Sequence, residues 1–242
     1  MSLLTITGLS HSYGDHVLYR NAEFTLNKGE HIGIVGQNGT GKSTLIKICT
    51  EQVIPDQGRI VRQPGITVGY LDQYAKLEEY LTVKEFSYPD KIRVGELCEE
   101  TMSLYREPED YKKLLRRFGL EEKSHSPVSD LSGGQRQRLF IVLALIPGPE
   151  VVFLDELTTG LDVKARREVW RYLEHLKKEG MTILLTSHFM DEVNALCDRV
   201  AILKRGRTVF CGTVQEAVDA SPYCTLEEAY LWFTEEEENE NI

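Results

Sequence analysis

The sequence lacks a long hydrophobic run. Its longest apolar stretches fall far short of the roughly 18 residues that a membrane-spanning helix needs. The opening stretch MSLLTITGLSHSYG has no basic segment followed by an apolar one, so no signal peptide is expected. The five cysteines form no C-x-x-C pair and are odd in number, which argues against a disulfide framework and indicates a reducing compartment. We therefore expect a cytosolic protein that does not itself cross a membrane.

Basic residues are also scarce: 28 Lys and Arg stand against 38 Asp and Glu, for a net charge of −10. Nucleic-acid-binding domains usually carry a basic face, so this balance argues against a nucleic-acid partner. Several of the excess acids lie in the final stretch EEEENE. A run of like charges at a chain end predicts a solvated, disordered tail over residues 235–242.

The first 74 residues carry the pattern of short strands. LLTITGLSHSYG and AEFTLNKGE alternate apolar and polar residues and break at glycine-containing turns. HIGIVG is a short apolar strand that leads into a glycine-rich loop, and KSTLIKICT predicts a helix of about three turns. GRIVRQPGITVGYLDQ predicts two more strands around a Pro-Gly turn.

The character of the chain changes between residues 75 and 130, where charged and leucine-rich stretches have helical spacing. In DYKKLLRRFGLEEK, one helical face carries Leu114, Leu115 and Phe118. After this helical insert, VVFLD and TILLTSH are nearly continuous apolar runs, as in parallel strands buried on both faces. A helix between them is predicted to start at an Asp162 N-cap, with a buried stripe of Val169, Trp170, Leu173 and Leu176. RVAILKRGRTVFCG predicts a hairpin.

The stretch GQNGTGKS, residues 36–43, fits the phosphate-loop pattern G-x-x-x-x-G-K-[ST]. An apolar strand precedes it and a helix follows it, which is the context that the pattern requires. Its glycines let backbone N–H groups face the β- and γ-phosphates, Lys42 adds a positive charge, and the Ser43 hydroxyl is a candidate Mg²⁺ ligand. The loop therefore predicts a nucleoside triphosphate site.

Five further residues fit this chemistry. Asp155 and Glu156 follow a buried strand, where Asp155 can hold Mg²⁺ and Glu156 can orient or deprotonate the attacking water. His188 ends another such strand, although a lone histidine there is more often structural. Gln73 follows a predicted strand and can reach metal and water, or is a surface glutamine. Tyr13, in a turn, can stack on adenine or simply pack.

LSGGQ, residues 131–135, is a second candidate phosphate site in the same chain. Its two glycines permit a close backbone approach, and they open an apolar helical run whose N-terminus favours an anion. A single domain that already has one complete phosphate loop has no evident need for a second phosphate site.

The order of these motifs resembles that of the ATP-binding cassette (ABC) family along nearly the whole chain. The matching motifs are GQNGTGKST, Gln73, LSGGQ, VVFLDE, GLD and His188. The resemblance implies an α/β fold: a P-loop NTPase core with a mostly parallel sheet, an N-terminal antiparallel β subdomain and an inserted α-helical subdomain. It implies a single nucleotide-binding domain over residues 1–234, with a β subdomain and core at 1–74, a helical subdomain at about 75–146, and core again at 147–234.

The resemblance also implies an ATPase that uses ATP and Mg²⁺, in which two cassettes face each other head to tail. LSGGQ of one cassette would then close over ATP on the phosphate loop of the other, and Asp162 would lie at the dimer face. The implied catalytic residues are Lys42, Gln73, Glu156 and His188, and the implied metal ligands are Ser43, Gln73 and Asp155. The implied nucleotide contacts are Tyr13, Gly36, Asn38, Gly39, Gly41, Lys42, Ser43, Thr44, Ser132, Gly133, Gly134, Gln135 and Asp162.

One residue departs from the family pattern, because Leu157 stands where the family usually has proline after the acid pair. Unlike proline, a leucine leaves the φ angle free and has an N–H donor. The loop that holds Glu156 is therefore expected to be less rigid than with proline.

Two lineages within the family resemble different parts of the chain. Up to about Phe86 the chain looks like the ribosome-associated F subfamily, and from about Gly95 it looks like cassettes that power exporters. The chain is either a divergent natural cassette or a recombined one.

The leading hypothesis is an ATPase subunit at the inner face of the cell membrane, with a permease as partner. A soluble translation factor is the alternative, and it fits the acidic charge and single cassette less well. A DNA-repair ATPase would need a long coiled coil that the insert lacks.

Overall fold

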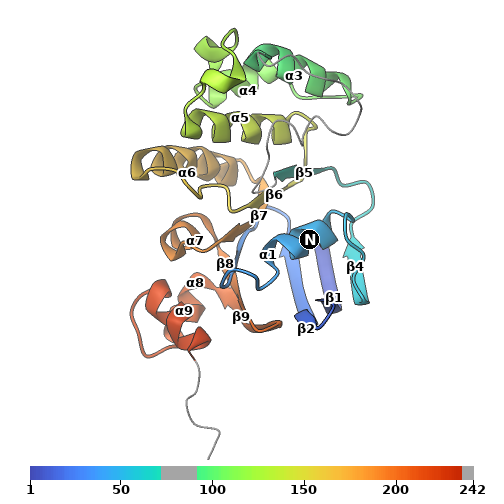
Figure 1. Ribbon diagram of the computed structural model, residues 1–242, viewed down its shortest axis with the longest axis vertical. Coiled ribbons are helices and arrows are strands. Elements are labelled where there is room, and N and C mark those ends of the chain that lie inside the picture. Colours follow the sequence, from blue (N-terminus) through green and yellow to red (C-terminus); the bar gives the residue numbers. More distant parts are fainter. Residues whose placement is uncertain (72–91, 236–242) are drawn as a thin grey trace, which may run out of the picture. The chain divides into compact units, whose positions relative to one another are not determined.

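The computed structural model describes residues 1–71 and 92–235. The chain divides into two compact units (Figure 1): the first comprises Met1–Gln63 and the chain from Leu184 onward, and the second comprises Pro64–Ile183. Within the residues that the structure covers, none of the helices combines the length and hydrophobicity needed to cross a bilayer.

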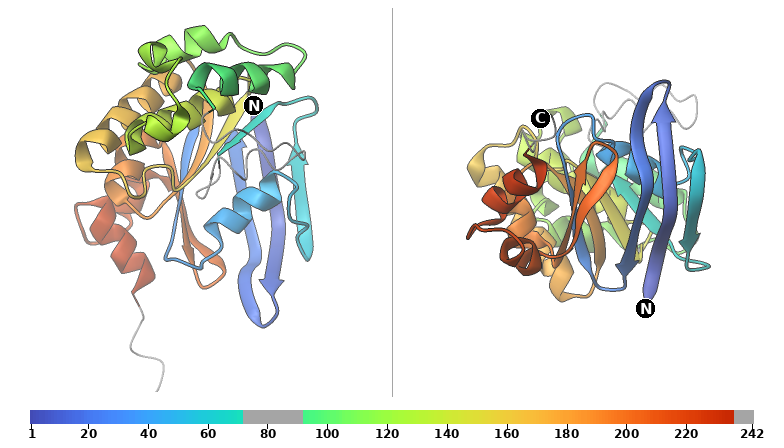
Figure 2. Two further views of the ribbon diagram at one scale, coloured as in Figure 1. Left: turned by 45° about the horizontal axis from the view of Figure 1, so that its top comes forward. Right: turned by 90° about the horizontal axis from the view of Figure 1, so that it is seen from below.

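The first unit contains a three-stranded antiparallel sheet in the order β2-β1-β4. Its strands are β1 (Ser2–Tyr13), β2 (His16–Asn27) and β4 (Gln57–Arg62). In Figure 2 the three strands lie side by side in both views, with β1 in the middle. Leu4 and Ile6 of β1 are buried, because the alternating pattern turns both to one face. Leu9 is also buried, and it follows a shift in the β1–β2 register after Ile6.

The same unit holds the parallel pair of β3 (His31–Val35) and β8 (Arg199–Lys204), and β9 (Arg207–Thr213) adds to β8 in antiparallel fashion. Its helices are α1 (Lys42–Cys49), α7 (Met190–Leu196), α8 (Val214–Asp219) and α9 (Leu226–Thr234). The β8–β9 hairpin turns at Arg205 and Gly206, which both have positive φ, as tight hairpin turns require.

The second unit pairs β5 (Val68–Leu71) in parallel with β6 (Val151–Asp155). Its helices are α3 (Val94–Ser103), α4 (Tyr111–Arg117), α5 (Gly133–Leu145) and α6 (Val163–Lys178), with two 3₁₀ turns at Glu121–Lys123 and Val128–Asp130. Strand β7 (Thr182–Ser187), buried along its whole length, spans the boundary between the units.

The predicted fold class is confirmed: the strands form a mostly parallel α/β sheet together with an antiparallel β subdomain. The two strands expected around the Pro-Gly turn are present as β4 and β5, and they belong to different sheets. Two details differ from the prediction. Helix α1 has eight residues, which is nearer two turns than three. Trp170, expected in the buried stripe of α6, is only half-buried, whereas Val169, Leu173 and Leu176 are buried.

The subdomain boundaries at residues 74 and 146 stay predictions, since the two units divide the chain at other places. The tail predicted to be disordered lies outside the described residues except for Glu235, whose backbone carbonyl accepts a hydrogen bond from Lys204 Nζ at 2.6 Å.

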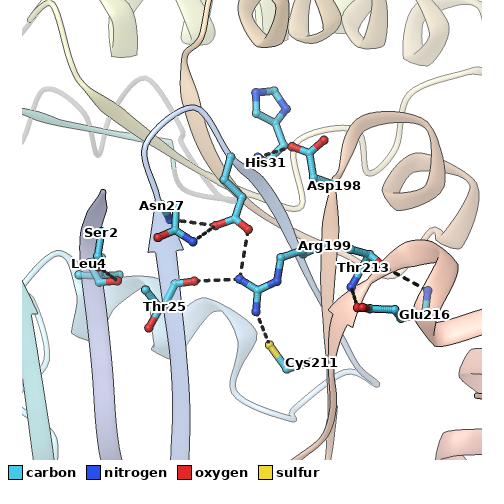
Figure 3. Close-up of polar contacts among 11 residues, drawn as sticks. Ser2, Leu4, Thr25, Asn27, His31, Asp198, Arg199, Cys211, Thr213 and Glu216 are labelled. Carbon is cyan, nitrogen blue, oxygen red and sulfur yellow. Dashed lines mark hydrogen bonds and ion pairs between the residues drawn. The ribbon is translucent and has the colours of Figure 1, made fainter.

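Arg199, at the start of β8, connects several segments of the first unit (Figure 3). Its Nη1 donates to Glu30 Oε1 at 3.1 Å and to the Thr25 carbonyl at 3.2 Å, and its Nη2 lies 3.3 Å from Cys211 Sγ. Glu30 Oε2 also accepts the Asn27 backbone N–H at 2.8 Å. The Arg199 guanidinium thus ties β2 and the turn before β3 to both strands of the β8–β9 hairpin.

Arg199→Ala is expected to lower the free energy of unfolding by about 1.5–3 kcal/mol, because it removes charge-assisted hydrogen bonds and leaves the largely buried Glu30 carboxylate without its cation. Urea unfolding would measure the loss. The matched control is Arg116→Ala, which breaks the fully exposed Arg116–Glu121 pair and should change stability little. Equal losses in the two variants would contradict the role assigned to Arg199.

Candidate functional site

The phosphate loop predicted from the sequence connects β3 to α1. It turns through Gly39 and Gly41, whose φ angles of 82° and 96° are left-handed. Only glycine adopts this backbone readily. A Cβ on Gly36 would lie 2.7 Å from Thr40 Oγ1 and 3.0 Å from the Leu203 carbonyl, so this position also excludes a side chain. The loop therefore needs its glycines for backbone geometry and for close packing.

Lys42 is the first residue of α1 and is buried, with a relative exposure of 4%. Its Nζ donates to the carbonyls of Gly36 at 3.0 Å and Gln37 at 3.2 Å. The ammonium group of Lys42 therefore lies against backbone carbonyls on the inner side of the phosphate loop. Ser43 and Thr44 follow in the first turn of α1, and Asn38 is exposed at the tip of the loop. The first turn of α1 has no acidic residue, so the positive end of the helix dipole favours an anion there.

The β1–β2 hairpin contacts the phosphate loop through two side chains. His16 Nε2 lies 3.3 Å from the Gly39 carbonyl, and the Tyr19 hydroxyl donates to the Gly41 carbonyl. Tyr13, the candidate adenine platform, is 55% exposed, and its ring meets His11 edge-on at a centroid distance of 4.9 Å. His16 and Tyr19 were not predicted from the sequence, because neither belongs to the loop pattern.

The acid pair ends β6 in the second unit. Asp155 and Glu156 are buried, at 1% and 8% exposure. Glu156 has φ of 45°, a left-handed backbone that few non-glycine residues adopt. The Thr159 N–H donates to the Glu156 carbonyl at 3.1 Å, and the side chain of Leu157 is buried. Leu157 thus anchors a tight turn whose first residue is the candidate catalytic glutamate.

The LSGGQ stretch forms the N-terminus of α5. Ser132 is the N-cap: its Oγ accepts the Gln135 N–H at 3.3 Å, and Gln135 Oε1 accepts the Ser132 N–H at 3.0 Å. A Cβ on Gly134 would lie 2.9 Å from the Cβ of Ala165 in α6, and one on Gly133 would lie 3.3 Å from Leu161. Packing and capping within the unit therefore account for these residues without a ligand, and their nucleotide contacts stay predictions.

Two other predicted residues have clear local roles. Asp162 caps α6, since its Oδ1 accepts the Ala165 N–H at 2.9 Å, as the sequence predicted. His188 is exposed just after β7, with its ring 4.0 Å from that of Phe189. Gln73 lies outside the described residues. Among the residues that the structure does describe, no cluster of three or more His, Cys, Asp or Glu side chains forms a ready metal site.

The loop between β3 and α1, its buried lysine and the parallel strands around it define a nucleotide-binding domain of the strand–loop–helix type. The family model described as ABC transporter matches residues 19–159, which is more than half of the chain. This chain belongs to the ABC transporter family, and it is the ATP-hydrolysing cassette of that family.

The chain is 34% identical to Nod factor export ATP-binding protein I of Rhizobium johnstonii, over 94% of this chain and 74% of that protein. It is 26% identical to a solved ATP-binding subunit of an ABC transporter, with a TM-score of 0.78, covering 97% of this chain and all of that one. A bacterial cassette solved as a dimer, 21% identical, shares the fold with a TM-score of 0.70 over 87% of this chain and 98% of its own.

Lys42→Ala is expected to weaken ATP binding by roughly 10- to 100-fold, because a charge-assisted contact to the phosphates is lost. Isothermal titration calorimetry would measure the affinity. Lys47→Ala, in the last turn of the same helix, is the matched control and should bind ATP as the wild type does. Unchanged affinity in Lys42→Ala would mean that the backbone N–H groups of the loop suffice.

Proposed function

We propose that this chain works as one of two cassettes in a head-to-tail dimer that hydrolyses ATP and thereby powers export through a membrane permease. The observation that carries the proposal is the phosphate loop, with left-handed Gly39 and Gly41 and a buried Lys42 held over it. The export function is supported by relatives named as export ATP-binding proteins, which match 94% of the chain. The cassette would then lie at the inner face of the membrane.

Each candidate residue has a role in this proposal. Lys42 and the loop N–H groups bind the β- and γ-phosphates, together with Asn38 and Thr44, and Tyr13 stacks on adenine. Mg²⁺ would be held by oxygen donors, for which Ser43, Gln73 and Asp155 have the right chemistry, and it would neutralise phosphate charge. The burial of Asp155 at a strand end is consistent with a carboxylate kept for a cation. Glu156 orients the attacking water, with His188 and Gln73 assisting.

The dimer gives the second glycine stretch a function. Ser132, Gly133, Gly134 and Gln135 of one chain would contact ATP bound to the loop of the other, and Asp162 would lie at that interface. The dimeric cassette that shares this fold supports the arrangement. Two weak backbone sites that clamp one polyphosphate exclude water and strengthen each contact.

The alternative of an F-subfamily ribosomal protein, or of a cassette recombined from two lineages, rests on the different resemblances of the two parts of the chain. The export relative aligns across both parts, which favours a single lineage of transporter cassettes. Purification from membranes discriminates the two functions: co-purifying permease supports transport, and co-purifying ribosomal material supports the alternative.

Glu156→Gln is expected to keep ATP affinity and to lower the hydrolysis rate by roughly 10²–10⁴-fold, the usual contribution of a general base. A phosphate-release assay and calorimetry measure the two properties on the same preparation. Thr159→Val, which removes a hydroxyl 3.5 Å from Glu156 Oε2, should have a far smaller effect and serves as the control. A Glu156→Gln chain that hydrolyses ATP at the wild-type rate would show that another group activates the water.

A complementation experiment tests the head-to-tail dimer. Lys42→Ala and Ser132→Arg chains should each be inactive alone. In a mixed dimer one composite site carries both lesions and the other carries none, so activity should return to about a quarter of the wild-type rate when half of the dimers are mixed.

Thermal unfolding would first establish that Ser132→Arg folds, because Ser132 is the N-cap of α5. No recovery, with mixed dimers shown to form by co-purification of differently tagged chains, would rule out either the trans arrangement or independent action of the two sites.

A further inference from the structure

We propose that the β1–β2 hairpin is a brace that fixes the phosphate loop, with Tyr19 and His16 as positioning residues for the polyphosphate. The inference rests on the proposed ATP site, and it assigns a role to two residues outside every motif of that site. All the contacts that carry it lie within the first unit.

Tyr19 acts on the last residue of the loop before the helix. Its hydroxyl donates to the Gly41 carbonyl, which also accepts the first helical hydrogen bond, from Leu45 N–H at 2.8 Å. Tyr19 is only 1% exposed, so its hydroxyl has little water to bond instead. A buried hydroxyl that loses its acceptor is costly, so the bond holds the Gly41 carbonyl toward the hairpin.

Holding that carbonyl also fixes the next N–H group. In a planar trans peptide the C=O and the following N–H point in opposite directions. With the Gly41 carbonyl turned to Tyr19, the Lys42 N–H points away from the hairpin. This N–H belongs to the first turn of α1, and the N–H groups of a first helical turn are the ones that bind anions. Tyr19 therefore sets the direction of a phosphate-binding group without touching phosphate.

Gly41 and Tyr19 are complementary in shape. A Cβ at position 41 would lie 2.6 Å from the Tyr19 hydroxyl oxygen, too close for any side chain. The hydroxyl thus occupies the space that the glycine leaves open. The left-handed φ of 96° at Gly41 is the conformation in which this contact forms.

His16 acts in the same way on the middle of the loop. Its Nε2 lies 3.3 Å from the Gly39 carbonyl, and since a carbonyl only accepts, Nε2 carries the proton and donates. The same peptide unit contributes the Thr40 N–H, which bonds the Gln37 carbonyl at 3.3 Å and closes the turn. His16 also pairs with Tyr13 across the hairpin. The candidate adenine platform and the brace therefore belong to one hairpin turn.

Tyr19→Phe tests the proposal, because it keeps the ring and removes only the hydroxyl. Calorimetry with two ligands, ATP and inorganic tripolyphosphate, separates the base from the phosphates. Tyr19→Phe should weaken both ligands by a similar factor of roughly 3–10, which corresponds to one lost hydrogen bond. Tyr13→Ala should weaken ATP and leave tripolyphosphate unchanged.

Tyr111→Phe is the matched control, since it removes the hydroxyl of another buried tyrosine, which bonds Glu99 at 2.7 Å in the second unit. It should bind both ligands as the wild type does. His16→Gln, which retains a donor, should bind tripolyphosphate more tightly than His16→Ala. Thermal unfolding of each variant shows whether any loss of affinity follows loss of stability.

Several results would overturn the proposal. The first is a Tyr19→Phe chain that binds both ligands as tightly as the wild type. The second is a Tyr19→Phe chain that loses affinity for ATP alone. The third is a Tyr19→Phe chain that loses no more affinity than an equally destabilised Tyr111→Phe chain. If the wild-type chain binds ATP but millimolar tripolyphosphate displaces none of that ATP, the phosphate loop is not preformed and the brace is refuted. A wild-type chain that binds no ATP at all would instead refute the proposed function.

Discussion

The site of this protein depends on the left-handed backbone at Gly39 and Gly41. This conformation brings the chain from the buried strand β3 into α1 within a few residues and turns the helix start toward an anion. Neighbouring features reinforce it: Gly36 packs against the Leu203 carbonyl, and Lys42 bonds carbonyls inside the loop. The loop is thus held from within by its lysine and from outside by the hairpin.

The features that depend on local pattern could be predicted from the sequence. The phosphate loop has a fixed spacing, buried parallel strands such as β6 are short apolar runs, and the Asp162 cap of α6 follows from a helix start signal. Because the carboxyl ends of such strands carry functional loops, Asp155 and Glu156 could be singled out as an acid pair. Even the length of α1 was overestimated by only a turn, the usual uncertainty at helix ends.

Features that depend on contacts between distant segments were not predictable. Tyr19 lies between the two stretches predicted as the first strands and belongs to no motif, and only the fold brings its hydroxyl to Gly41. Gly134 is predicted to contact phosphate, and Ala165 of α6 also lies so close to it that its lack of a side chain has a structural reason as well. The departure at Leu157 was visible, but the buried environment of its side chain was not. For Tyr19 and Gly134 the decisive neighbour lies on another element.

If Glu156 orients the attacking water, as proposed, its left-handed backbone sets stability and chemistry against each other. Glycine and asparagine tolerate this conformation better than glutamate, so either would relieve strain at the turn. Neither carries a carboxylate. A library selected only for thermal tolerance should therefore enrich glycine and asparagine at position 156, whereas one selected for ATP turnover should retain glutamate. Under the proposed role of Glu156, a sequence selected for stability and a sequence selected for ATP turnover would therefore diverge at this position.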